Sequence, residues 1–257
     1  NLEKILSKIN LNQFEIDKIL NNQIIRKCLF LQNDVQNKNY SNQTQFRYII
    51  APLLDCVSTD QFKLTSVETC YMPSVKSVAE QGFFCSLLAD LYMPSLEQIA
   101  YDSFGHCNLV KVNFQNLRTM QSTHQFYNCT KLRIFIAEQL EIISECCFNQ
   151  CKVLKIVIAP KALPNNHAFS ECIKLKATLI SQNDFKCNCR SCPKCFNKMA
   201  ECYIHGKLAA KEMKIQDLCK ESDQIIKQLC EHTKIYRERL KMVRKQGFLL
   251  TEVERIL

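Results

Sequence analysis

The chain has 257 residues, of which 47% are hydrophobic, so it can bury one large core or two smaller ones and is not disordered as a whole. No run approaches the ~18 consecutive apolar residues that span a bilayer, so we expect no membrane span. The net charge of +9 is uneven, because residues 186–257 alone contain 16 Lys and Arg against 9 Asp and Glu.

The first 45 residues are predicted to form a cap and a linker. Leu2, Ile5 and Ile9 recur at helical spacing, and further apolar residues continue at similar intervals to Leu20, which predicts one or two short amphipathic helices. We therefore assign residues 1–32 to a helical N-terminal cap. Residues 33–45 are polar and rich in Asn and Gln, and this composition predicts a linker.

Phenylalanines recur at a nearly fixed interval through the middle of the chain. They stand at positions 62, 83, 104, 126, 148 and 169, so the intervals are 21, 21, 22, 22 and 21 residues. A second column with the same period consists of Leu54, Val75, Leu96, Leu117, Leu140 and Leu163. A constant period of this length predicts a solenoid, which we place at residues 46–181.

Each repeat also carries a stretch in which apolar residues alternate with others. The predicted buried sets are Ala89/Leu91/Met93, Val110/Val112/Phe114, Leu132/Ile134/Ile136, Leu154/Ile156/Ile158 and Leu175/Ala177/Leu179. Such alternation predicts one half-buried strand in each repeat. A period near 22 suits a strand, a turn and a short convex segment, and is too short for the paired helices of tetratricopeptide or ankyrin repeats.

Residues 46–181 resemble the BspA-like class of leucine-rich repeats, whose units read roughly aF..C..L..I.lP..l..I. The stretch FYNCTKLRIFIAEQLEIISECCFNQC at 126–151 follows this pattern, while the first unit lacks the Phe-x-x-Cys and PNNHAF at 164–169 departs from it. The resemblance implies a leucine-rich-repeat solenoid with a parallel β-sheet that serves protein recognition, adhesion or surface display.

The cysteines and histidines of the repeats are not accompanied by the residues that a catalytic site would require. The repeat cysteines are expected to form a buried thiol ladder, because free Cys packs as a small hydrophobe. These cysteines are Cys107, Cys129, Cys151 and Cys172. His106, His124 and His167 lie beside the Phe column without a recurring carboxylate or Ser, and four glycines leave no phosphate-binding loop. We therefore expect no enzyme activity.

The same alternation predicts two columns of side chains that point away from the core. The first column reads Asp90, Lys111, Arg133, Lys155 and Lys176, and the second reads Tyr71, Tyr92, Asn113, Phe135, Val157 and Thr178. Like charges on neighbouring strands, about 4.8 Å apart, repel one another unless an anion neutralises them. We expect this face to bind an acidic protein segment or another polyanion. The alternative is that the Lys side chains splay into solvent.

Directly after the last repeat, six candidate metal ligands fall within 19 residues. They are Cys187, Cys189, Cys192, Cys195, Cys202 and His205, in a segment, residues 182–206, that we expect to close the end of the solenoid. Two-residue gaps let neighbouring thiolates meet on one tetrahedral ion, so zinc is the leading hypothesis. Disulfides, an iron–sulfur cluster and free thiols remain open alternatives.

Residues 207–257 are predicted to form a basic amphipathic helix, at about 207–245, and a tail. The apolar seam of this helix contains Ile226, Leu229, Thr233, Tyr236, Leu240 and Val243 at steps of three and four. The seam predicts either self-association of the helix, for example as a coiled coil, or docking of the helix onto another surface. The Lys and Arg residues opposite form a solvated face or contact an anionic surface.

These features predict a non-enzymatic protein-interaction module or scaffold that binds a protein partner on its sheet face. Two other classes stay open. A secreted or surface adhesin requires a signal upstream of Asn1, and without one we expect a cytoplasmic protein. A nucleic-acid-associated protein would use the cysteine cluster and the basic helix, and its binding would depend on salt.

Overall fold

The computed structural model describes residues 2–12, 15, 18–34, 38–181 and 185–214. The chain divides into two compact units, residues 1–209 and 210–257. The elements are α1 (Leu2–Ile9), β1 (Gln23–Ile25), β2 (Cys28–Phe30), β3 (Tyr48–Ile50), β4 (Cys56–Val57), β5 (Thr69–Tyr71), β6 (Ser77–Val78), β7 (Asp90–Tyr92), β8 (Gln98–Ile99), β9 (Lys111–Asn113), β10 (Thr119–Met120), β11 (Ile134–Ile136), β12 (Ile142–Ile143), β13 (Ile156–Ala159), β14 (Leu163–Pro164) and β15 (Ala177–Ile180). Residues 199–214 are helical as well, and none of the described helices is long and apolar enough to cross a membrane.

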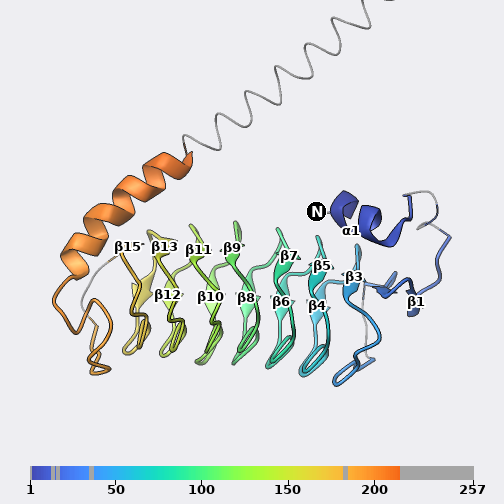
Figure 1. Ribbon diagram of the computed structural model, residues 1–257, viewed down its shortest axis with the longest axis horizontal. Helices are drawn as coiled ribbons and strands as arrows, with labels where there is room; N and C mark the ends of the chain where they lie inside the picture. The colour runs from blue at the N-terminus through green and yellow to red at the C-terminus, as the bar shows by residue number, and fades with distance from the viewer. Residues whose placement is uncertain (1, 13–14, 16–17, 35–37, 182–184, 215–257) are drawn as a thin grey trace, which may run out of the picture. The chain divides into compact units, whose positions relative to one another are not determined.

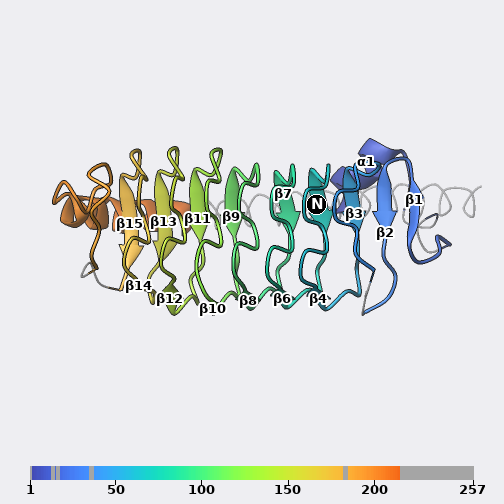
Figure 2. The same ribbon diagram turned by 90° about the horizontal axis from the view of Figure 1, so that it is seen from below.

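The first unit is a solenoid in which each coil places strands on two opposite sides (Figures 1 and 2). On one side β2, β3, β5 and β7 pair in parallel, and β9, β11, β13 and β15 continue the row as a second parallel sheet. We call this row the main sheet. On the other side the strands have two residues each, too short to show an alternation in sequence, and for this reason the prediction of one strand per repeat was incomplete.

A column of aromatic rings runs through the core. Consecutive rings from Tyr40 to Phe169 stack nearly parallel, with centroids 5.2–5.8 Å apart, through Phe62, Phe83, Phe104, Phe126 and Phe148. Phe185 ends the column with its ring at 67° to Phe169. All the rings are buried. The predicted phenylalanine repeat is therefore confirmed as the centre of the fold, and the column extends beyond it by one ring at each end.

The predicted helical cap and linker need correction. Within residues 1–32, β1 and β2 form an antiparallel hairpin, and β2 then pairs with β3, so the cap is helical only in part and the sheet is not wholly parallel. Tyr40, in the predicted linker, stands 22 residues before Phe62 and stacks on it. Its backbone N–H donates to Gln61, which ties this segment to the next coil. This segment therefore belongs to one additional coil, which the sequence did not predict because the segment is mostly polar.

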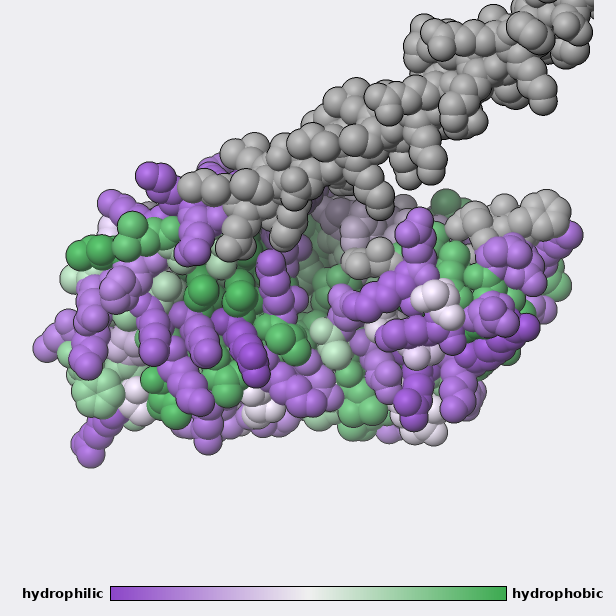
Figure 3. All heavy atoms as spheres, turned by 45° about the horizontal axis from the view of Figure 1, so that its top comes forward, coloured by the Kyte–Doolittle hydropathy of each residue, from purple (hydrophilic) through white to green (hydrophobic). Residues whose placement is uncertain are grey.

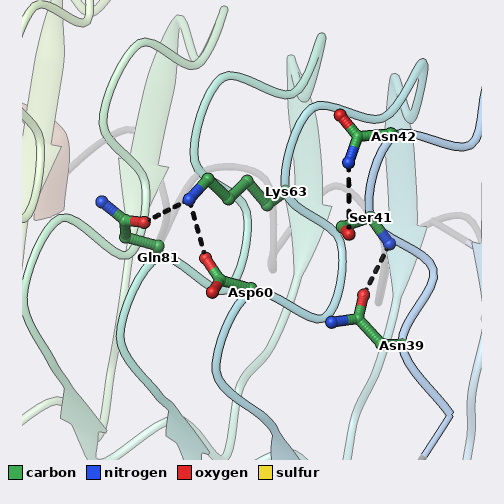
Figure 4. Close-up of polar contacts among 6 residues, drawn as sticks. All are labelled: Asn39, Ser41, Asn42, Asp60, Lys63 and Gln81. Carbon is green, nitrogen blue, oxygen red and sulfur yellow. Dashed lines mark hydrogen bonds and ion pairs between the residues drawn. The ribbon is translucent and has the colours of Figure 1, made fainter.

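Each ring from Phe62 to Phe169 lies, in the sequence, between two residues with left-handed backbone conformations. One column of positive φ contains Asp60, Gln81, Asp102, His124, Cys146 and His167, and the other contains Asn42, Leu64, Cys85, His106, Asn128, Gln150 and Glu171. The three histidines of the repeat region therefore occupy turn positions. Figure 4 shows side chains that join neighbouring turns: Lys63 Nζ donates to Gln81 Oε1 at 2.6 Å and lies 3.0 Å from Asp60 Oδ1.

The cysteines three residues after the rings from Phe104 to Phe169 are confirmed as a buried thiol ladder. The thiols of Cys107, Cys129, Cys151 and Cys172 each donate to the carbonyl oxygen of the phenylalanine one coil earlier, at 3.0–3.1 Å. Burial raises the pKa of all four thiols, to about 12 for Cys107. A protonated thiol is a poor nucleophile, so the ladder serves packing and hydrogen bonding.

Removing one thiol from the ladder is expected to destabilise the solenoid. Cys129→Ala removes a donor to the carbonyl oxygen of Phe104 and leaves a small void, at a cost of about 1–2 kcal/mol in the free energy of unfolding. Cys146→Ala, at a half-buried position in the next coil, is the control and is expected to cost less. Urea denaturation measures both, and equal costs would contradict the structural role of the ladder.

A buried carboxyl group in the turns makes stability depend on pH. Burial raises the pKa of Asp102 to about 6, although hydrogen bonding from Gln81 and the charge of Lys63 oppose the shift. The native state therefore holds the proton more tightly than the unfolded chain, and this contribution is lost as pH rises from about 4 to 6. Asp102→Asn keeps a residue type suited to positive φ and is expected to raise the free energy of unfolding by about 1–2 kcal/mol at pH 8, with little effect at pH 4.

The control for this prediction is Asp55→Asn, at an exposed position. Urea unfolding of both variants at the two pH values gives the comparison. A difference between Asp102→Asn and the parent chain that does not change with pH would contradict the assignment.

Candidate binding face and cysteine centre

The main sheet has one face toward the aromatic column and one face away from it, which we call the outer face. Over β2, β3 and β5 the helix α1 covers the outer face and buries Ile5, Leu6 and Ile9 there (Figure 1). Lys4 Nζ extends this contact to Asp90 Oδ2 of β7, at 2.6 Å. We call the outer face of β7, β9, β11, β13 and β15 the open face, because α1 does not reach its later strands.

The strand register differs from the prediction in the later coils. Phe135 pairs with Val112 on one side and Val157 on the other, and all three are buried against the core. Phe135 and Val157 were therefore wrong as partner-binding residues, and Thr178 is buried too. The residues that point outward are Ile134, Ile136, Ile156, Ile158, Ala177 and Leu179.

The cause of the slip is one additional residue between turn and strand. The coils of β9, β11 and β13 bury a leucine before the strand, but the next buried residue comes three positions later, as in Leu132 and Phe135 or Leu154 and Val157. Counting in steps of two from the leucine therefore assigns the wrong face. In the second periodic column, Leu163 is 42% exposed, whereas Ala162, one position earlier and 22 residues after Leu140, is buried.

Four exposed cations stand at the start of the later strands of the main sheet. Lys111 belongs to β9, and Arg133, Lys155 and Lys176 each directly precede β11, β13 and β15. The ion pairs between residues that the structure describes include none of these four. Lys111 is aligned with Ile134, one position further along the strand than the level of Arg133, although the sequence placed all four cations in one column.

Aromatic and aliphatic side chains line the open face beside these cations. Tyr71 packs against the residues under α1 and stacks on Tyr92, with ring centroids 5.2 Å apart, while Tyr92 is 37% exposed. Asn113 follows as an exposed polar position. Ile134, Ile136, Ile156 and Leu179 are half-buried, and Ile158 is buried. Figure 3 shows hydrophobic side chains between hydrophilic ones on this side of the molecule.

Four cysteines converge just beyond the last coil. The sulfur atoms of Cys187, Cys189, Cys192 and Cys195 all lie within 4.8 Å of one another. The Sγ–Sγ distance is 3.6 Å between Cys187 and Cys192, 3.7 Å between Cys192 and Cys195, and 3.8 Å between Cys189 and Cys195. The described cysteines are all free thiols. We call this group the four-cysteine centre.

Cys202 and His205 stand outside this group, although the sequence placed them with it. Both lie on the helix of residues 199–214, where Cys202 Sγ donates to the carbonyl oxygen of Leu175 at 3.7 Å. His205 Nδ1 lies 3.3 Å from the carbonyl oxygen of Lys176. Helix formation from residue 199 directs these two side chains toward the last coil. Short sequence spacing could not reveal this difference, because the start of the helix lies inside the cysteine-rich segment.

The thiols of Cys187, Cys189 and Cys192 differ in acidity. Burial raises the pKa of Cys192 and that of Cys187, the latter to about 11. Burial acts in the same direction at Cys189, but hydrogen bonds from the backbone of Glu171 and from Ser191 outweigh it and lower the pKa to about 5. Cys189 is therefore a thiolate at neutral pH, the form that binds soft metal ions.

The helix predicted at about 207–245 begins earlier, at residue 199, and its described part ends at residue 214. The apolar seam from Ile226 to Val243 lies outside the described residues. Within the described part, Gly206 was not singled out by the sequence analysis, yet it is buried against β15.

Comparisons with known proteins place these features in context. A family model described as the BspA type leucine rich repeat region matches residues 7–133 and 122–210, in six copies. Among solved structures, a leucine rich repeat protein of T. pallidum is similar at 14% sequence identity and a TM-score of 0.39. That match covers 58% of this chain and 84% of the other. No curated protein matches the chain.

Proposed function

Because the chain belongs to the BspA-type leucine-rich repeat family, we propose that it is a non-enzymatic protein-interaction module whose partner binds the open face. The observation that carries this proposal is the set of four exposed cations at the start of β9, β11, β13 and β15, beside partly exposed isoleucines of the same sheet. Adjacent like charges are unfavourable until an anionic group approaches them. The aliphatic side chains gain free energy when a partner removes them from water.

The proposed partner is an acidic protein segment with apolar side chains. Its carboxylates would meet Lys111, Arg133, Lys155 and Lys176, and its apolar side chains would pack on Tyr92 and the isoleucines of β11 and β13. In such interfaces the charges mainly accelerate association, whereas the apolar contacts slow dissociation.

Charge reversal on the open face is expected to slow association with such a partner. Arg133→Glu combined with Lys155→Glu should reduce the association rate constant about tenfold at low salt and flatten its salt dependence, because the steering charges are inverted. The partner is first captured by pull-down and identified by mass spectrometry. The association rate constant is then measured by stopped-flow fluorescence or surface plasmon resonance.

The matched control is Lys76→Glu combined with Lys161→Glu, which makes the same charge change near the short strands on the opposite side. Equal kinetics for the two double variants would place the binding surface elsewhere. Binding of the parent chain to DNA or RNA with a steep salt dependence, and to no acidic protein, would favour the nucleic-acid alternative instead.

We also propose a second function, that the four-cysteine centre holds one zinc ion. Four sulfurs at about 2.3 Å from a tetrahedral zinc ion lie about 3.8 Å from one another. The Sγ–Sγ distances of 3.6, 3.7 and 3.8 Å support that coordination. A disulfide requires about 2.05 Å. The proposal includes a reducing, cytoplasmic location, since zinc needs unoxidised thiolates.

Elemental analysis of the anaerobically purified chain is expected to find about one zinc per chain. Cys189→Ser combined with Cys192→Ser should remove the metal, because two ligands are lost, whereas Cys202→Ser should retain it. Absence of stoichiometric zinc in the parent chain, iron in its place, or loss of zinc from Cys202→Ser would each overturn this four-thiol assignment.

A further inference from the structure

The last strand of the main sheet needs cover on its free side. β15 pairs with β13 on one side and is the terminal strand of its sheet. A terminal strand presents unpaired N–H and C=O groups to which another strand can add. The residues of β15, Ala177 to Ile180, are uncharged and contain no proline, so an uncovered β15 is suited to pairing with another chain.

The helical residues 199–209 provide this cover. Gly206 lies so close to β15 that a Cβ atom there would stand 2.3 Å from the carbonyl carbon and oxygen of Thr178 and 2.7 Å from the Leu179 nitrogen. Four positions earlier, Cys202 donates to Leu175, and His205 lies beside the carbonyl of Lys176. The helix backbone is therefore in contact with the strand, and only glycine fits at the point of closest approach.

The segment that leads to this helix has no regular secondary structure of its own. Residues 185–198 contain neither a strand nor an α-helix, and their mutual backbone hydrogen bonds are those of turns. Phe185 anchors the start of the segment on Phe169, and Met199 is buried in the core at its end. Between these two residues, the four cysteine side chains converge, so the chain forms a compact loop that we call the knuckle. Cys187 packs against the core.

We infer that a metal ion in the four-cysteine centre keeps residues 199–209 seated over β15, so that loss of the metal uncovers this edge for pairing with a second copy of the chain. The inference rests on the proposed zinc function and adds a role to it. Metal binding that fixes four ligands contributes directly to the folding of the segment that carries them. The hydrogen bonds of Lys186 with His167 and Asn166 hold the start of this segment, and the ion would hold the part that carries the four cysteines.

The test is hydrogen exchange and solution mass of the full chain, with zinc bound and after treatment with a zinc chelator. Chelation is expected to accelerate exchange at the β15 amides at least tenfold and to raise the mass above that of the monomer. The amides of β5 and β11 are the internal reference, since both strands are paired on two sides. Readdition of zinc should reverse both effects.

Gly206→Leu separates the seating of the helix from the metal. This variant should keep its zinc yet show fast β15 exchange and self-association, because the new side chain forces the helix away from Thr178. The control is Lys207→Leu, which places the same side chain at the next residue, an exposed position. This variant should behave as the parent chain.

The outcomes distinguish the two proposals. A parent chain without zinc contradicts the proposed metal function. A zinc-loaded chain whose β15 exchange and mass do not change on chelation, or a Gly206→Leu variant with parental exchange, overturns the inference while the metal function stands. Accelerated exchange at β5 and β11 as well would mean general unfolding and would also overturn it.

Discussion

Each ring in the aromatic column is buried between the rings of the neighbouring coils, and the rest of the solenoid depends on this stacking. A coil of 21–22 residues has too little mass to enclose a phenylalanine by itself, so stability comes from stacking one coil on the next. The centroid distances of 5.2–5.8 Å keep the coils in step, and the thiol of each following cysteine fastens its coil to the carbonyl oxygen of the preceding ring. Ring and thiol together fix the rise per coil.

Such a column has two ends that no further coil covers, and this chain closes them differently. At the start, the hairpin of β1 and β2 extends the sheet, Tyr40 supplies an additional ring, and α1 covers the outer face. At the end, Phe185 turns its ring edge-on to Phe169, and the knuckle and helix cover the last coil. The two closures leave the open face between them. The position of the proposed binding surface is thus a consequence of how the ends are capped.

The turns show how the fold accommodates few glycines. Left-handed conformations recur twice in most coils, and residues such as Asp, Asn, Gln, His and even Leu occupy them. Each such position costs free energy unless the surrounding coil enforces it. The regular hydrogen bonds between successive turns supply that enforcement, for example from Leu64 N–H to Phe84 and from His106 N–H to Tyr127. His106, His124 and His167, which could be taken for catalytic residues, occupy these left-handed turn positions.

The sequence by itself determined the repeat, the class of fold and the aromatic and thiol columns. These features repeat with a nearly fixed period, and such a period can be recognised in the sequence without knowing which residues are in contact. Tertiary structure decided three matters. The additional residue after each leucine set the strand parity, which moved Phe135 and Val157 into the core and Ile134 and Ile156 out of it. Packing recruited Tyr40 from a polar segment. The start of a helix at residue 199 separated Cys202 and His205 from the other four ligands, because spacing along a chain does not specify where that chain turns.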